Sequence, residues 1–264
     1  MSAFPTIVRK KPVLSLQDEV ASLRAELKVE KQARIAAESK LAFLHTEHTS
    51  SDPPPSRMAI IVGLAKLAES RDDDTGQHLS RIRHYTTLIA TAFSELFPEK
   101  LSAAEVSIIG ATSVLHDIGK VGISDDILLN PNKLTEAQFD SMKRHTSIGA
   151  DILISLSEQL GRDPWVDTAI QITLGHHERW DGTGYPFGLR GEVNNLPARI
   201  VAVADVYDAL TSKRVYKDAM SHDEAVALIA KDSGTHFDPL VVDAFLVVIK
   251  KIKKIVTRFQ NHIT

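Results

Sequence analysis

Apolar residues recur every three or four positions through most of the chain, a spacing that places them on one face of an α-helix. The spacing is clear in segments 58–67, 82–97 and 106–115. Strand-like alternation of apolar and polar residues is scarce, and no repeat of fixed period is visible. The pattern therefore predicts an all-α protein, organised as a bundle of helices.

Helix starts are marked by three candidate capping boxes, in which a Ser or Thr side chain and a Glu or Gln three residues later bond each other's backbone. The pairs are Ser102 with Glu105, Thr135 with Gln138, and Ser221 with Glu224. Asp238 followed by Pro239 marks the start of the last helix, because proline is well tolerated in a first turn.

The N-terminal segment has a different pattern, a heptad repeat of apolar residues that is interrupted by the polar residues Glu30 and Arg34. The repeat consists of Val13, Leu16, Val20, Leu23, Leu27, Glu30, Arg34, Ala37, Leu41 and Leu44. Flanking residues of opposite sign, such as Glu19 and Arg24, would pair across a parallel dimer. We expect residues 1–48 to form a coiled coil that makes a homodimer; a single amphipathic helix packed on its own domain is the alternative.

A short polar stretch separates this helix from the rest. Residues 49–56 contain three consecutive prolines, Pro53–Pro55, which cannot continue a helix. We expect a stiff linker there. A compact domain is predicted over residues 57–264.

Composition narrows the function. The 264 residues include 31 Lys and Arg against 34 Asp and Glu, a net charge of −3, so no basic field favours a nucleic acid polymer. The absence of cysteine excludes disulfides and thiolate metal sites, and fits a cytoplasmic protein. No secretory signal is visible at the N-terminus, and no apolar run is long enough to span a membrane.

Histidines and aspartates interrupt or close several of the apolar runs. They are His78, His116, Asp117, His145, His176, His177 and Asp205. A buried carboxylate is costly unless it is paired or bound to a metal. Any one of these residues would suit an ordinary buried hydrogen bond. Together they favour one shared metal cluster.

The motifs around these residues occur in a specific order along residues 57–250. They include Thr75-Gly76-x-His78, His116-Asp117-Ile118-Gly119-Lys120, His145-Thr146, His176-His177, Gly184-Tyr185-Pro186 and Asp205-Val206-Tyr207-Asp208. This ordered set resembles the HD-GYP domain, a subgroup of the HD superfamily of metal-dependent phosphohydrolases. The resemblance implies a helical domain that hydrolyses the cyclic dinucleotide cyclic di-GMP to pGpG, GMP or both.

The resemblance also implies a set of metal ligands. His78, His116, Asp117 and Asp205 would form a first site, and Asp117 would bridge to a second ion held by His145, His176 and His177. Some members bind a third ion through a Glu four residues before the first His, a position that Asp74 takes here. We therefore expect two or three divalent ions. Ligands without sulfur suit Fe, Mn or Zn, and the resemblance favours Fe or Mn.

Other residues are expected to act on the substrate. Two metal ions can generate a hydroxide nucleophile and clamp a phosphate. Lys120 lies four residues after His116, so on a continuing helix it would share that face and reach a phosphate or the nucleophile. Asp117 and Asp208 are the other candidate catalytic residues; Asp208, three residues past Asp205, is expected either to orient a ligand or to accept a proton. The resemblance implies that the substrate-binding residues are Arg214, Lys217, Lys120 and Tyr185; Arg214 and Lys217 also suit a solvated helix end.

Two other functions stay open at this stage. The domain can be a signalling module that binds cyclic di-GMP without useful turnover, or a hydrolase of a related dinucleotide such as cyclic GMP-AMP. The resemblance also implies that the Gly184-Tyr185-Pro186 segment can dock partners such as diguanylate cyclases.

Overall fold

The structure, a computed structural model, describes residues 57–70, 77–212 and 219–260. The predicted coiled coil over 1–48 and the linker over 49–56 lie outside the described residues, as do Asp74, Arg214 and Lys217. The described residues form helices joined by turns and loops, without a strand longer than an isolated bridge, which confirms the all-α prediction. No described helix has the length and apolar character needed to cross a membrane.

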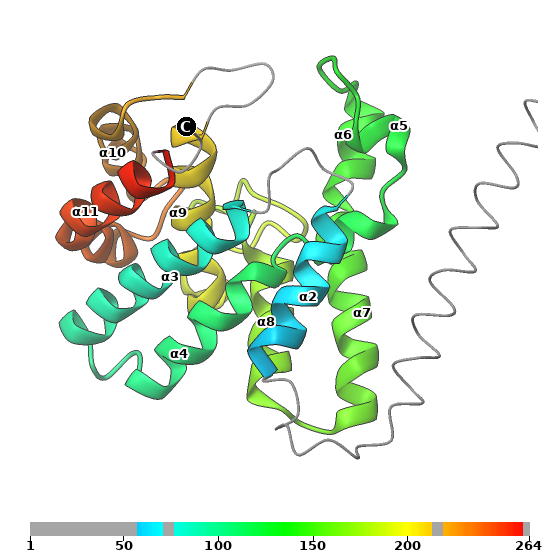
Figure 1. Cartoon of the computed structure of the whole chain (residues 1–264), viewed down its shortest axis with the longest axis horizontal. Coiled ribbons are helices and arrows are strands. Elements are labelled where there is room, and N and C mark those ends of the chain that lie inside the picture. Colours follow the sequence, from blue (N-terminus) through cyan, green and yellow to red (C-terminus); the bar gives the residue numbers. More distant parts are fainter. Residues whose placement is uncertain (1–56, 71–76, 213–218, 261–264) are drawn as a thin grey trace, which may run out of the picture. The chain divides into compact units, whose positions relative to one another are not determined.

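The helices follow one another along the chain as shown in Figure 1. The α-helices are α2 (Arg57–Glu69), α3 (Gln77–Leu96), α4 (Ala103–Thr112), α5 (Asp125–Leu128), α6 (Glu136–Lys143), α7 (His145–Leu160), α8 (Pro164–Gly175), α9 (Leu196–Thr211), α10 (His222–Lys231) and α11 (Pro239–Gln260). Short 3-10 helices are η1 (Ser113–Leu115), η2 (Ile118–Gly122) and η3 (Gly191–Val193).

The predicted helix starts are confirmed. Ser102, Thr135 and Ser221 each cap a helix and form a complete capping box with the Glu or Gln three residues later. At the start of α11, the Asp238 carboxylate accepts a hydrogen bond of 2.9 Å from the backbone N–H of Leu240. Such caps satisfy backbone donors that a helix leaves without partners in its first turn.

One hydrophobic cluster lies among α3, α4, α9, α10 and α11. Helix α3 contributes Tyr85, Ile89 and Phe93, which recur at four-residue steps and are almost fully buried. Helix α3 packs against α11, α4 and α9. The amphipathic spacing seen in the sequence is therefore the spacing of this core.

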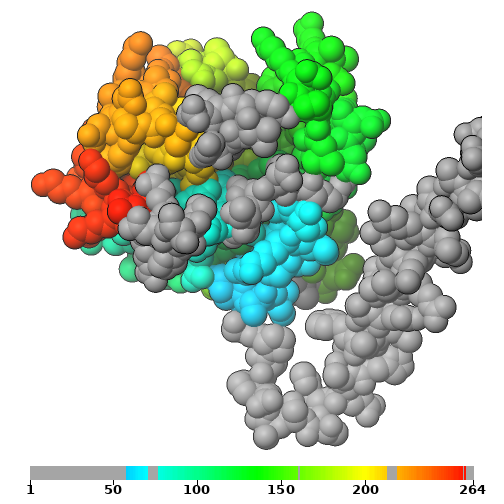
Figure 2. Space-filling model, turned by 45° about the horizontal axis from the view of Figure 1, so that its top comes forward, coloured from blue at the N-terminus to red at the C-terminus, as the bar shows by residue number. Residues whose placement is uncertain are grey.

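A second cluster joins α2, η1, α7 and α8, and includes Ile61, Leu115, Leu153 and Ala169. Helices α5 and α6 project from the body of the domain (Figures 1 and 2). The elements that carry the predicted site residues come from both clusters. Packing between them therefore decides whether those residues meet.

Candidate metal centre

The predicted ligands come from five separate places in the fold. His78 is in the first turn of α3, and Asp205 is in the middle of α9. His116 and Asp117 lie between η1 and η2, His145 begins α7, and His176 and His177 follow the end of α8.

The His116-Asp117 segment is a turn between two 3-10 helices. Helix α4 ends at Thr112, so Lys120 and His116 do not share a continuing α-helix. Lys120 nevertheless reaches the site, because its Nζ lies 3.0 Å from Oδ2 of Asp117. Tertiary placement, rather than helical spacing, thus brings the lysine to the carboxylate.

A glycine contact brings this turn to the start of α7. A Cβ at Gly119 would overlap the carbonyl oxygen of His145, and one at Gly149 would lie 3.0 Å from the backbone nitrogen of Gly119. Only residues without side chains allow so close an approach. The glycines therefore let Asp117 and His145 meet.

The ligand atoms form two groups. In each group, atoms from all members lie within 4.8 Å of one another. The first group is His78, His116 and Asp205; the second is Asp117, His145, His176 and His177. We refer to them as the His78 group and the His145 group.

Asp117 belongs to the His145 group and also faces the His78 group, so it lies between the other ligands of the two groups. Its Oδ1 is 3.3 Å from Nε2 of His145, and its Oδ2 is 3.4 Å from Nε2 of His116. The Nε2 of His116 is also 3.8 Å from Oδ1 of Asp205. One carboxylate thus turns one oxygen toward each group, the geometry of a ligand that bridges two cations.

The histidine rings are oriented by their other nitrogen. The Nδ1 of His116 donates to the Ser113 carbonyl at 2.9 Å, and the Nδ1 of His145 donates to the Met142 carbonyl at 2.8 Å. His176 Nδ1 faces two carbonyls of α8 at 3.1 Å. A carbonyl can only accept, so in a neutral ring the lone pair is on Nε2, which faces the site.

These inward atoms have no hydrogen-bond partner. The buried atoms without one include Nε2 of His116, His145 and His176, and Oδ1 of Asp117. Buried polar atoms in a native fold are normally satisfied, and several orphaned acceptors facing one another call for a cation. The residues present therefore fit divalent metal ions.

The charges around the site also favour a cation. Burial alone would lower the pKa of His116, but Asp117, Asp205 and Glu69 raise it to about 9. Burial would raise the pKa of Asp117, but Lys120 and His116 outweigh it and hold that pKa well below its usual value.

In the His145 group the pKa values of two histidines are lowered instead. Burial lowers the pKa of His145 to about 4, and burial together with His176 and His145 holds the pKa of His177 well below its usual value. At neutral pH these two rings are uncharged and ready to act as ligands.

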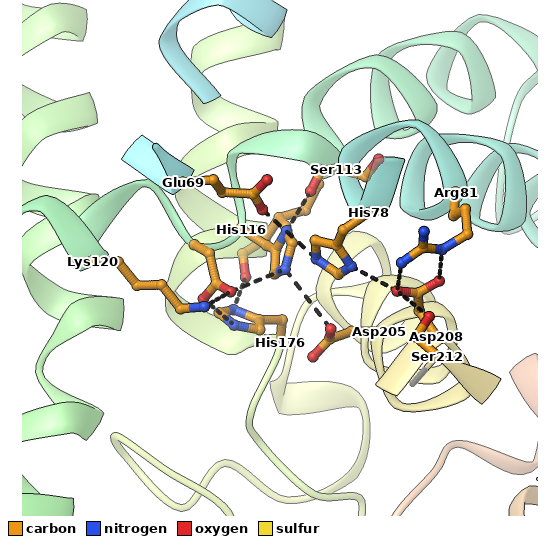
Figure 3. A network of polar contacts seen from close by, with 12 residues as sticks. Glu69, His78, Arg81, Ser113, His116, Lys120, His176, Asp205, Asp208 and Ser212 are labelled. Carbon is orange, nitrogen blue, oxygen red and sulfur yellow. Dashed lines mark hydrogen bonds and ion pairs between the residues drawn. The ribbon is translucent and has the colours of Figure 1, made fainter. Parts of the chain in front are cut away.

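Asp208 makes its contacts one turn along α9 from Asp205. Its Oδ2 accepts from Nδ1 of His78 at 2.7 Å, and both carboxylate oxygens accept from the guanidinium of Arg81. Figure 3 shows the carboxylate between these two side chains. The sequence placed Asp208 among the catalytic residues; its contacts give it the geometry of a residue that orients His78.

The loop that carries Gly184-Tyr185-Pro186 folds back on the tandem histidines. The Tyr185 ring stacks on the His177 ring with centroids 4.7 Å apart, and the Tyr185 backbone N–H donates to the His177 carbonyl. The buried Glu178 carboxylate accepts from the backbone N–H groups of Phe187 and Leu189. Tyr185 thus forms part of the wall beside the His145 group.

One buried acid near the site was missed in the sequence. Glu69 ends α2, and its Oε1 lies 3.7 Å from Nε2 of His78. Burial raises the pKa of this carboxyl. The available signal was an acid that closes the apolar run Leu64-Ala65-x-Leu67-Ala68. Asp117, Asp205 and the histidines were picked out by the same kind of signal.

Comparison with known proteins identifies the class. Residues 64–241 match the HD domain family, so the chain belongs to this family of metal-dependent phosphohydrolases and is expected, as a member, to bind divalent metal ions. It is similar to a "Cyclic di-GMP phosphodiesterase" of Vibrio cholerae, at 46% identity over 81% of this chain and 44% of the relative. That match confirms the resemblance to the HD-GYP phosphodiesterases.

Two further comparisons extend the picture. A "3'3'-cGAMP-specific phosphodiesterase 2" of Vibrio cholerae is 35% identical over 71% of this chain and 34% of the relative. The crystal structure of a cyclic GMP-AMP specific phosphodiesterase of Vibrio cholerae is similar to this chain, with a TM-score of 0.52 and 19% sequence identity. The match covers 77% of this chain and 53% of that one, and it shows that the two share a fold. The chain spans about half the length of the curated relatives it matches.

Proposed function

We propose that this chain is a metal-dependent phosphodiesterase that hydrolyses cyclic di-GMP to pGpG, GMP or both. Water adds to phosphorus, the bond from phosphorus to a ribose 3′-oxygen breaks, and that oxygen takes a proton. The similarity to phosphodiesterases named for cyclic di-GMP supports this substrate class.

The observation that carries the proposal is the position of Asp117 between two groups of ligand atoms. The distances of its two oxygens to His116 and His145 suit a pair of adjacent cations. Bound there, two divalent ions would act as Lewis acids toward water and the phosphate oxygens. We propose His78, His116, Asp117 and Asp205 as ligands of one ion, and Asp117, His145, His176 and His177 as ligands of the other.

The chain's own residues supply the remaining charge. Lys120 Nζ, beside Asp117, is a cation placed to donate a hydrogen bond to a phosphate oxygen or to the leaving oxygen. Tyr185, stacked on His177, offers a ring edge and a hydroxyl to the substrate. We propose Arg214 and Lys217 as phosphate contacts and Asp74 as a ligand of a third ion, on their sequence positions alone.

We propose iron or manganese as the metal. The donor set holds imidazole and carboxylate without sulfur, which suits both ions. Elemental analysis of the purified protein, as metal per chain, tests identity and number together. Two ions per chain would support the paired groups, and three would support the additional site.

The test of the activity is a turnover assay with protein loaded separately with Fe²⁺ and Mn²⁺. We expect cleavage of cyclic di-GMP, and its loss in His116→Ala and Asp117→Ala. Cyclic GMP-AMP is assayed in parallel, because relatives named for that substrate also match. Faster cleavage of cyclic GMP-AMP would reassign the substrate, and tight binding without product would make the chain a binding module.

The partner proposals rest on the N-terminal segment and on the Tyr185 loop. We propose a homodimer through residues 1–48, which sedimentation of the full chain tests. We also propose that a diguanylate cyclase docks at the Tyr185 loop, which a pull-down tests. A cytoplasmic location is the last part of this proposal, and cell fractionation tests it.

A further inference from the structure

Glu69 is a buried acid whose carboxylate has one oxygen without a partner. Its side chain is 8% exposed, and Oε2 has no hydrogen-bond partner among the described residues. The other oxygen, Oε1, is 3.7 Å from Nε2 of His78. In Figure 3 the carboxylate points toward the His78 and His116 rings.

The place of Glu69 in its helix makes this burial more costly. Glu69 is the last residue of α2, where the helix dipole is negative and disfavours a carboxylate. Among the described residues, no lysine or arginine forms an ion pair with Glu69, and its ion-pair neighbour is the imidazole of His78. A buried charge is retained when a partner compensates it, and a metal ion is such a partner.

The distance between the two atoms permits a shared ion. Ligand nitrogen and oxygen atoms lie about 2.0–2.2 Å from a divalent ion, so two of them can be up to about 4.2 Å apart. The 3.7 Å between Oε1 of Glu69 and Nε2 of His78 falls within that range. Asp208 holds Nδ1 of His78, which leaves Nε2 as the metal-binding nitrogen.

We propose that Glu69 is a metal ligand, which binds the ion of the His78 group together with Nε2 of His78. This inference rests on the proposed metal centre and adds a carboxylate that no sequence motif selects. It makes the end of α2 part of the proposed metal centre. The resemblance assigns an extra carboxylate to Asp74 instead, so the two acids are tested side by side.

The experiment measures Mn²⁺ binding by the full chain. Metal-free wild type, Glu69→Gln and Asp74→Asn are titrated against a fluorescent chelator, and metal per chain is read by elemental analysis. We expect Glu69→Gln to lower the Mn²⁺ affinity of the His78 group at least about tenfold. The loss of a direct ligand should cost no less affinity than the loss of an outer-shell partner. Hydrogen exchange at the end of α2 should slow on Mn²⁺ binding in the wild type and stay unchanged in Glu69→Gln.

Glu95→Gln is the control, because Glu95 is an exposed glutamate in the last turn of α3, at the opposite end of that helix from His78. Its Mn²⁺ affinity should equal that of the wild type. Equal affinity and equal exchange in folded Glu69→Gln would overturn the inference. A wild type that binds no metal would instead overturn the proposed metal centre itself.

Crystals of the wild type with Mn²⁺ keep the inference testable if Glu69→Gln does not fold. An anomalous peak about 2.0–2.3 Å from the Glu69 carboxylate supports it. Peaks in the two groups with none within bonding distance of Glu69 would overturn it.

Discussion

The Asp208 carboxylate lies 2.7 Å from Nδ1 of His78 and also pairs with the guanidinium of Arg81. All three side chains are largely buried. The carboxylate therefore fixes both the tautomer and the orientation of the first histidine of the site. Such an outer partner raises the basicity of a ligand and aims its free nitrogen.

Asp208→Asn should therefore weaken metal binding by about 10- to 100-fold. The amide keeps the shape but loses the charge that holds His78, and its NH₂ group conflicts with Arg81. Activity should fall most at limiting metal and recover in part at excess metal. Mn²⁺ titration followed by turnover measures both, with the exposed Asp223→Asn as the control. An unchanged Mn²⁺ affinity would contradict the positioning role.

Lys120→Met should lower kcat about 100-fold, since a charged donor beside the reacting phosphate is lost. The side chain lies 3.0 Å from Asp117 and is not a metal ligand, so metal per chain should stay unchanged. Steady-state kinetics of the Mn²⁺-loaded enzyme give kcat. The exposed Lys100→Met, a lysine that pairs with Glu192, serves as the control. Full activity in Lys120→Met would contradict a catalytic role for this lysine.

Gly119→Ala should destabilise the metal-free protein by about 1–3 kcal/mol or more, because the new methyl overlaps the His145 carbonyl and must push η2 from α7. The same shift separates Asp117 from His145, so metal affinity should fall as well. Gly63→Ala is the contrast: a Cβ there meets no atom within 4 Å, and alanine favours the helix by about 0.5–1 kcal/mol. Urea unfolding compares the two variants. A Gly119→Ala protein as stable as the wild type would show that the two segments can separate freely.

Acid should destabilise the fold in part through His236. Burial is the main reason that the pKa of His236 falls to about 4. In the unfolded chain the imidazole of His236 is protonated below about pH 6.5, whereas in the folded protein it is protonated only near pH 4 and below. Stability from this group is therefore complete above pH 6.5 and is lost as pH drops toward 4. His145 and His177 add to the same trend in the metal-free protein.

His236→Gln should reduce the fall in Tm between pH 7 and pH 4.5, measured by thermal unfolding followed by circular dichroism. His84→Gln, at an exposed position of α3, should leave that fall as it is in the wild type. A fall of the same size in His236→Gln and in the wild type would contradict the assignment.

Local features of the domain were predictable from the sequence because they depend on neighbours in the chain. The three capping boxes and the start of α11 need only residues within three positions of each other. The apolar spacing of α3 likewise fixes which face of that helix is buried. The candidate ligand residues stood out because His and Asp are costly in apolar runs.

The fold changed two expectations that were based on spacing along a helix, one for Lys120 and one for Asp208. Helix α4 ends at Thr112, so Lys120 reaches Asp117 across a turn rather than along a helical face. Asp208, three residues after Asp205, faces His78 and Arg81. Spacing along a helix gives the direction of a side chain, but not what lies in that direction.

The sequence by itself determined the helical class of this domain, its helix starts and the types of side chain that could hold metal. Only the tertiary structure decided how those side chains sort into two groups with Asp117 between them, and that Glu69 lies beside His78. The physical reason is distance along the chain. The site joins residues more than a hundred positions apart, and the contacts that join them, such as Gly119 against the start of α7, exist only once the helices have packed.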